Sequence, residues 1–225
     1  MRISIVVLTY NGYKYTHQLL MDIKQNCKNV YEVIVVDNGS EDINVKQGLE
    51  FWLGLNVLPL KVCELAKNRG FVGGMNYGLT KATGDVVVLL SNDVRIYSSS
   101  FLTVIEEEFA KDKLILLGAT LYEHDTGWNS FDGKIYPYVE GYFLAATKGF
   151  WKLSGGFDER YAPSDFEDVD LSTQAVQHFC CTLKKIPGGM VEHLVGKTYG
   201  YTDERRNRTV ANRAKFAKKW GISET

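Results

Sequence analysis

Three short runs of apolar, largely β-branched residues constrain the fold of this chain more strongly than any other feature. They occupy residues 3–8, 33–36 and 86–90. A continuous apolar run of this length is typical of a strand that is buried on both faces, as in a parallel sheet covered by helices. We therefore expect these runs to form central parallel strands.

Helical periodicity separates the first two runs. The spacing of one helix face is kept by Thr16, Leu20, Ile23 and Cys27. The alternation continues with an expected helix near residues 42–53, a strand near 57–65 and a helix near 71–81. This repeated strand and helix order predicts an α/β, Rossmann-like fold, in which helices flank a mostly parallel central sheet.

The pattern changes in the second part of the chain. Residues 114–122 predict one more strand, and the aromatic and glycine-containing residues 127–142 predict a small antiparallel subregion. Because no linker separates the parts, we expect a single domain over residues 1–225. Its predicted parts are residues 1–95, residues 96–200 and a basic C-terminal helix (201–225).

Composition limits which kinds of binding partner and which cell compartment we expect. The 225 residues carry 26 basic and 27 acidic side chains and a net charge of -1, so no overall field favours nucleic acid. The four cysteines form no CxxC pair, which favours free thiols in a reducing cytoplasm. Since no apolar run approaches the ~20 residues of a membrane span, we expect a soluble cytoplasmic protein or one that is peripheral to a membrane.

Polar residues follow the three apolar runs at the point where each predicted strand ends. Thr9, Tyr10 and Asn11 follow the first run, Asp37 follows the second, and Asn92 and Asp93 follow the third. Ligands of open parallel sheets bind beyond the carboxyl ends of the strands, so these groups are candidate nucleotide contacts. Taken alone, the residues from Asp37 onward are better explained by a turn and a helix cap.

Arg69 and Asp93 are candidates for binding phosphate, Arg69 directly and Asp93 through a metal ion. The Arg69 guanidinium precedes a glycine-rich helix and suits a diphosphate or a base carbonyl, although the chain has no Walker loop. Asp93 closes a buried strand, where its carboxylate needs a partner, and a divalent metal bridging it to phosphates would supply one.

The order of these motifs resembles that of the family 2 glycosyltransferases, inverting nucleotide-sugar enzymes with the GT-A fold, and in particular the rhamnosyltransferase-like branch. The likeness covers most of the chain, and it implies that residues 1–95 form a nucleotide-sugar-binding half and residues 96–200 an acceptor and catalytic half. It is carried by VVLTYN at 6–11, VVDNGSED at 35–42, NRGF at 68–71, LLSND at 89–93, GGFDE at 155–159, FEDVDL at 166–171, His193, and RNR at 206–208.

The resemblance implies roles for individual residues. Thr9, Asn11, Asp37 and Arg69 match the nucleotide contacts of a donor linked to UDP, dTDP or GDP. Asp93 matches the last carboxylate of the D-x-D motif that holds Mn²⁺ or Mg²⁺, and His193 matches a further metal ligand. Position 91 is Ser, so the first carboxylate of a strict D-x-D motif is missing.

Asp168 matches the catalytic base of the family, with Glu167 as the reserve candidate. Without the resemblance, acidic residues in the first turn of a helix are explained by its dipole. The implied reaction is a single displacement in which a base deprotonates the acceptor hydroxyl and the anomeric carbon is inverted.

The acceptor side is less specific. Trp128, Phe131, Tyr136 and Tyr142 either form a stacking platform for a sugar or pack within hairpins. A basic segment, interleaved with aromatic residues, either contacts an anionic membrane or acceptor phosphates, or docks as a terminal helix. It contains Arg205, Arg206, Arg208, Arg213, Lys215, Lys218 and Lys219.

The sequence thus predicts an inverting, metal-dependent glycosyltransferase that acts on a hydroxyl of a glycan, lipid-linked or protein-linked acceptor. Two alternatives are a catalytically silent nucleotide-sugar-binding protein, favoured by Ser91, and a nucleotidyltransferase. The second alternative requires a glycine-rich basic triphosphate loop, and the chain has no convincing one.

Overall fold

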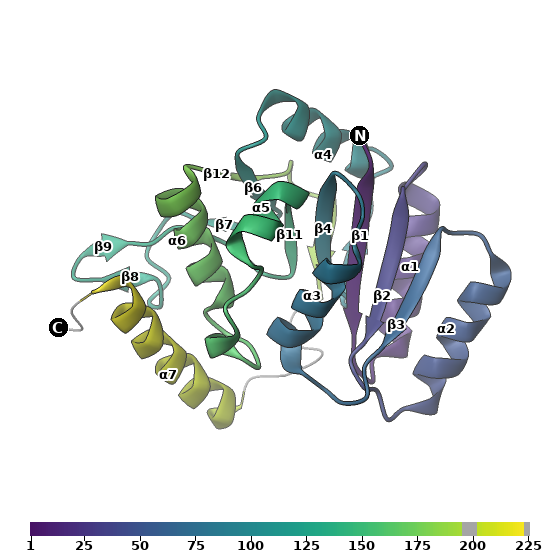
Figure 1. Cartoon of the computed structure of the whole chain (residues 1–225), viewed down its shortest axis with the longest axis horizontal. Helices are drawn as coiled ribbons and strands as arrows, with labels where there is room; N and C mark the ends of the chain where they lie inside the picture. Colours follow the sequence, from purple (N-terminus) through teal and green to yellow (C-terminus); the bar gives the residue numbers. More distant parts are fainter. Residues whose placement is uncertain (195–201, 223–225) are drawn as a thin grey trace.

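The apolar runs form the centre of a seven-stranded sheet in the computed structural model, which describes residues 1–194 and 202–222 (Figure 1). Its parallel half has the order β3-β2-β1-β4. These strands are β1 (Ile3–Thr9), β2 (Glu32–Asp37), β3 (Leu60–Glu64) and β4 (Val86–Ser91). Because every residue of β1 and β2 is buried, the expected central parallel strands are confirmed.

The other half of the sheet mixes directions. β11 (Phe143–Thr147) lies antiparallel to β4 and to β6 (Ile115–Gly118), and β12 (Thr182–Lys185) lies parallel to β6. The single strand expected over residues 114–122 is wrong. The chain leaves the sheet after Gly118, where a Cβ atom would collide with the Val139 side chain of a second, crossing sheet.

Short antiparallel pairs occupy the region where the sequence pattern changes, as expected. β7 (Leu121–Tyr122) pairs with β10 (Tyr138–Val139), and β8 (Ser130–Phe131) pairs with β9 (Lys134–Ile135). A further pair joins β5 (Val94–Ile96) to β13 (Val191–His193). This last pair brings a segment near the end of the chain to the carboxyl end of β4.

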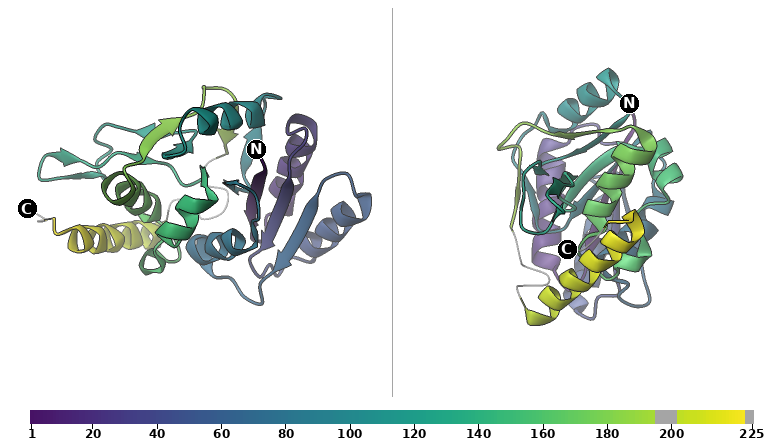
Figure 2. Two further views of the ribbon diagram at one scale, coloured as in Figure 1. Left: turned by 45° about the horizontal axis from the view of Figure 1, so that its top comes forward. Right: turned by 90° about the vertical axis from the view of Figure 1, so that its left-hand side faces the viewer.

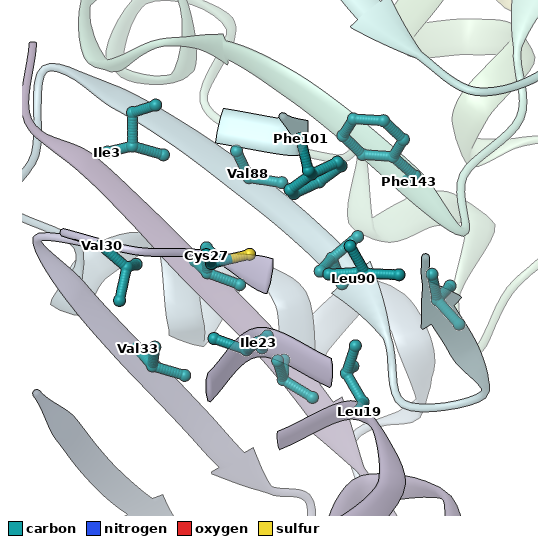
Figure 3. Packing of buried hydrophobic residues seen from close by; sticks show 14 of the residues in the cluster. Ile3, Leu19, Ile23, Cys27, Val30, Val33, Val88, Leu90, Phe101 and Phe143 are labelled. Carbon is teal, nitrogen blue, oxygen red and sulfur yellow. The ribbon is translucent and has the colours of Figure 1, made fainter. Parts of the chain in front are cut away.

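Helices cover both faces of the sheet because successive residues of each strand point to opposite faces. One face packs against α1 (Tyr13–Asn26), α2 (Ile43–Leu55) and α4 (Phe101–Lys111). The other face packs against α3 (Gly70–Lys81), α5 (Lys148–Ser154) and α6 (Glu167–Phe179). Figure 3 shows Leu19 and Ile23 of α1 near Val33 and Leu90 of the sheet, and Val88 of the sheet beside Phe101 of α4.

Close packing of α3 fixes the position of the loop that precedes it. A Cβ atom on Gly78 would collide with Val6 of β1, and one on Gly74 would collide with Leu8. The glycines therefore let the helix approach the sheet more closely than larger residues would allow. The N-terminus of α3 consequently lies near the carboxyl ends of β1 and β2.

The basic C-terminal helix α7 (Asp203–Trp220) packs on a third apolar cluster, beside α6 and the β8–β9 hairpin (Figure 2). Phe216 is fully buried in this cluster against Phe131, Tyr136 and Phe166. A 3-10 turn at Glu159–Tyr161 completes it through Tyr161. Within the described residues, no helix is both long enough and apolar enough to cross a bilayer.

Candidate functional site

Three strand ends converge at one edge of the sheet. Thr9 lies beside Asp37 in the register of β1 and β2, and Leu8 lies beside Ser91 in the register of β1 and β4. We call the polar residues at this edge the donor edge, namely Thr9, Asn11, Asp37, Asn38 and Asn92. The expected meeting of the polar strand ends is thus present.

Side chains at the donor edge hydrogen-bond mainly to the loops and helix starts around them. The Thr9 hydroxyl is buried and accepts a hydrogen bond from Thr16 Oγ1 at 2.7 Å. Asn92 Nδ2 contacts Thr9 Oγ1 at 3.3 Å, Thr16 Oγ1 at 3.2 Å and the Gly12 carbonyl at 3.3 Å. These bonds tie the ends of β1 and β4 to the first turn of α1.

The loops after β1 and β2 are joined in the same way. Asn11 has a φ of 50°, and its Oδ1 accepts from the Glu41 and Asp42 backbone N–H groups at 2.8 and 3.0 Å. Asp37 Oδ1 accepts from Ser40 N at 2.9 Å. Asp37 and Asn11 therefore shape turns, and their contact with a nucleotide stays a prediction.

Asn38 was not among the expected site residues, yet it connects the donor edge to α3. Its Nδ2 donates to Asn68 Oδ1 at 3.0 Å and to the Gly70 carbonyl at 2.9 Å, while its Oδ1 accepts from Arg69 N at 3.0 Å. Arg69 is thereby held at the start of α3 with its side chain exposed. An asparagine within a turn sequence gave no signal of this role.

Asp93 and His193 meet although 99 other residues separate them in sequence. β13 places His193 opposite Val94, and His193 Nε2 lies 3.3 Å from Asp93 Oδ1. The imidazole stacks on Tyr142 with ring centroids 4.3 Å apart. Its buried Nδ1 has no hydrogen-bond partner among the residues that the structure describes.

Asp93 Oδ1 and His193 Nε2 are spaced as two ligands of one divalent ion would be. Two ligands at adjacent octahedral positions, with bonds near 2.1 Å, lie about 3 Å apart, close to the observed separation. No group of three acidic, histidine or cysteine side chains in residues 1–194 and 202–222 forms a metal cage. Magnesium-type sites commonly use one or two protein ligands together with substrate phosphates, so two residues suffice.

The loop before α6 is held in a strained conformation. Asp165 and Phe166 both have a φ of 76°, a region that non-glycine residues rarely occupy. Arg205 and Arg208 of α7 bind the Asp165 carboxylate, and Asn212 Nδ2 donates to the Asp165 carbonyl at 2.7 Å. The C-terminal helix therefore fixes the backbone from which Glu167 and Asp168 project.

Asp168 has the geometry of a poised carboxyl group. Its Oδ2 accepts from Gly141 N at 3.0 Å, and its Oδ1 accepts from Val169 N at 2.8 Å. Burial, followed by the negative charge of Glu140, raises the pKa of Asp168 to about 7. A carboxyl group with such a pKa exchanges protons near neutral pH.

Glu140 and Glu167 accompany Asp168, and we call these three residues the carboxyl wall. Burial and then the charge of Asp168 raise the pKa of Glu167 well above its ordinary range. Glu167 is only 6% exposed, and its Oε2 has no hydrogen-bond partner within the described chain. Glu140 was missed in the sequence, where a lone acid among aromatic residues gives no signal.

One cavity of about 610 Å³ brings most of these groups together. Among the ten residues expected at the site, six line it, namely Tyr10, Asn92, Asp93, Glu167, Asp168 and His193. The remaining four, Thr9, Asn11, Asp37 and Arg69, do not line this cavity. The metal pair and the expected base therefore share one space, which is large enough for a small-molecule ligand.

The four aromatic residues expected on the acceptor side have different surroundings. Phe131 and Tyr136 are buried around Phe216, so packing accounts for them. Tyr142 stacks on His193. Trp128 lines the cavity and is 39% exposed.

Most of the basic C-terminal side chains make contacts within the protein. Arg213 donates to the Trp128 and Ser130 carbonyls, and Lys219 lies 2.6 Å from Asp170 Oδ2. Lys215 donates to the Arg160 carbonyl at 2.8 Å. These contacts fit a docked helix, and contact with a membrane stays a prediction.

Comparison with known proteins matches the chain to a family of glycosyltransferases. The family model described as glycosyl transferase family 2 matches residues 4–162. The uncharacterized glycosyltransferase YfnE of Bacillus subtilis (strain 168) is 28% identical over 173 residues, which are 76% of this chain and 41% of YfnE. This chain thus spans less than half the length of that relative, and it covers 33% of YwdF from the same organism.

Solved structures share the fold at low sequence identity. The mannosyltransferase PcManGT from Pyrobaculum calidifontis, in complex with GDP-Man and Mn²⁺, has a TM-score of 0.73 and 20% identity. The match covers 97% of this chain and 63% of that one. GalNAc-T7 with UDP, GalNAc and Mn²⁺ has a TM-score of 0.75 and 14% identity, over 96% of this chain and 48% of that one.

The family match and these neighbours agree with the fold and the family expected from the motifs, whereas the rhamnosyltransferase-like branch stays a prediction. By the extent of the family match, this chain belongs to glycosyl transferase family 2.

Proposed function

We propose that this chain transfers a sugar from a nucleotide-diphosphate sugar to an acceptor hydroxyl, with a divalent metal and with inversion at the anomeric carbon. The observation that carries the proposal is the single cavity that contains both the Asp93–His193 pair and Asp168. Donor phosphates need a cation, and the acceptor hydroxyl needs a base, and this cavity offers residues for both.

Asp93 and His193 would hold the ion against the donor diphosphate. Similar folds were solved with GDP-Man and Mn²⁺ and with UDP and Mn²⁺, which supports Mn²⁺ or Mg²⁺ here. When bound, such an ion offsets the negative charge that grows on the leaving diphosphate. Tyr10 and Asn92, which line the cavity, and Thr9, Asn11, Asp37 and Arg69 beside it are proposed to place the nucleotide.

Asp168 would act as the base. It takes the proton of the acceptor hydroxyl while that oxygen bonds to the anomeric carbon and the bond from this carbon to the diphosphate breaks. The N–H groups of Gly141 and Val169 hold the carboxylate in place. A pKa of about 7 suits this role because the carboxylate is populated near neutrality and still accepts a proton readily. Glu167 remains the reserve candidate.

A ligand panel followed by product analysis tests the proposal. UDP, dTDP and GDP, together with their sugars, are added with Mn²⁺ or with chelator, and thermal unfolding is recorded. A ligand at 100 times its Kd stabilises a protein by about 2.7 kcal/mol, so a metal-dependent shift identifies the donor class. NMR of the new glycosidic linkage then reports whether the anomeric configuration has inverted.

The controls separate metal binding from general effects. Asp93→Asn should abolish the metal-dependent part of the shift, whereas Glu159→Gln, on an exposed carboxylate of the 3-10 turn, should not. Stabilisation by nucleotide without product would favour the silent binding protein. No stabilisation by any nucleotide in either condition would contradict the proposal.

A further inference from the structure

We infer that Trp128 forms an acceptor subsite for an uncharged sugar ring, which stacks on the indole and directs its hydroxyl groups to the carboxyl wall. This inference rests on the proposed sugar transfer and names the chemical class of the acceptor. It is carried by the rigid loop around Trp128 and by the charges that line the cavity.

A buried asparagine fixes the loop that presents Trp128. Asn129 is fully buried, and its Oδ1 accepts from Thr126 N at 2.9 Å and from Thr126 Oγ1 at 2.8 Å. Its Nδ2 donates to the His124 and Tyr136 carbonyls at 3.2 and 3.1 Å. These four hydrogen bonds hold the two sides of the loop together around the Asn129 amide.

The backbone of Trp128 is also held from outside the loop. Arg213 of α7 donates from Nε to the Trp128 carbonyl at 3.2 Å, and its guanidinium lies 4.1 Å from the centroid of the Phe131 ring. The backbone of Trp128 is therefore held in place before any ligand arrives. A ring on a preorganised loop loses less conformational entropy on binding than a ring on a flexible one.

The indole is far more exposed than the neighbouring aromatic side chains. Phe131 and Tyr136, from the same hairpin region, are 3% and 8% exposed, whereas Trp128 is 39% exposed and lines the cavity. An exposed large apolar ring at a concave site is typical of ligand binding. The C–H face of a pyranose offers an apolar surface that matches it.

The charges around the cavity favour an uncharged acceptor. Apart from the Asp93–His193 pair, five acidic side chains and two arginines line it. They are Glu140, Asp165, Glu167, Asp168 and Asp203, with Arg205 and Arg206. Arg205 forms an ion pair with Asp165 at 3.0 Å. The carboxyl wall therefore dominates the charge on this side.

A sugar hydroxyl also meets the needs of Glu167. The Oε2 atom of Glu167 is buried and has no protein partner in the described ranges, and a buried polar atom of this kind favours a ligand that hydrogen-bonds to it. A hydroxyl both donates and accepts, so it satisfies this carboxyl in either protonation state. A phosphate on the acceptor would instead add negative charge beside Asp168 and raise the pKa of that base further.

Acceptor kinetics test the subsite. Methyl glycosides of uncharged hexoses and their disaccharides are compared with glycerol phosphate and a polyprenyl phosphate. We expect transfer to the uncharged glycosides, and we expect Trp128→Ala to raise the KM for the acceptor about tenfold or more. Trp128→Phe, which keeps an aromatic face, should restore most of the affinity.

A matched control uses another exposed aromatic residue. Phe51 of α2 is 56% exposed and does not line the cavity, so Phe51→Ala should leave the acceptor KM unchanged. Preferential transfer to either phosphate would overturn the inference. An acceptor KM for Trp128→Ala within about twofold of the parent value would also overturn it.

Saturation-transfer NMR separates this inference from the proposed function, because it detects glycoside binding without a donor. Glycoside binding that depends on Trp128, in a chain that does not turn over any nucleotide sugar, would contradict the proposed function and leave the subsite standing. Turnover of a nucleotide sugar without any glycoside binding would overturn the subsite alone.

Discussion

The donor edge and the carboxyl wall lie at neighbouring parts of one end of the sheet, but their polar groups differ in how well the protein satisfies them. At the donor edge, Asn92 donates a hydrogen bond to Thr9, and Asn38 bonds to the Asn68 side chain and the Arg69 backbone. At the carboxyl wall, three acidic groups crowd together, and burial raises the pKa of each one.

This difference separates stability from chemistry. Satisfied hydrogen bonds at the donor edge hold three loops in register and contribute to folding. Buried neighbouring carboxyl groups oppose folding, and they persist because α7 and the strained Asp165–Phe166 backbone hold them. Such destabilised, pKa-shifted groups cluster at functional sites, so the carboxyl wall is where catalysis is expected.

The largest expected effect follows from removing the base. Asp168→Asn should lower turnover by about 10²- to 10⁴-fold, the usual contribution of general-base catalysis. Stabilisation by nucleotide and Mn²⁺ should persist because the metal pair is unchanged. Steady-state kinetics with Glu159→Gln as the control checks this, and near-parental turnover would transfer the role to Glu167.

A substitution at the donor edge should lower the stability of the folded protein. Asn38→Ala removes an amide that makes three hydrogen bonds to the start of α3, one of them to the carbonyl of the buried Gly70. We expect the free energy of unfolding to fall by about 2–3 kcal/mol. Urea unfolding measures the loss, with the exposed Asn207→Ala as the control. A loss below ~0.5 kcal/mol would remove the contrast between the two regions.

Asp168 of the carboxyl wall should make the unfolding free energy of the protein depend on pH. The pKa of Asp168 rises from an ordinary 3.8 to about 7 on folding, so the native state binds more protons than the unfolded state between these values. The parent therefore loses stability as pH rises from about 4 to about 7. Asp168→Asn lacks this loss. The unfolding free energy of the variant minus that of the parent should therefore increase over this pH range and stay constant above it.

Urea unfolding of both proteins at several pH values measures this difference. If the difference in unfolding free energy between the parent and Asp168→Asn does not change with pH, Asp168 has its ordinary pKa in the folded protein.

The smallest expected effect concerns Glu140, whose charge helps to raise the pKa of Asp168. Glu140→Gln should lower that pKa and move the acidic limb of the kcat profile to lower pH. The exposed Glu123→Gln, outside the cavity, serves as the control. An unchanged acidic limb would mean that burial alone sets the pKa of Asp168.

Sequence patterns predicted the architecture well because strand burial and helix periodicity are local signals. The parallel half of the sheet and the small antiparallel pairs appeared where expected, and the helix expected near residues 71–81 spans Gly70–Lys81. The break after Gly118 was not predicted because it depends on the crossing strand β10. The division into functional halves stays a prediction.

The sequence alone determined the family, the central sheet and the acidic residues from which a base would be chosen. Only the tertiary structure brought His193 to Asp93 and placed Glu140 beside Asp168. It also showed that α7 holds the strained loop before α6. The reason is physical: periodicity reports how each segment buries itself, whereas the pKa and partner of a side chain depend on residues that are distant in sequence.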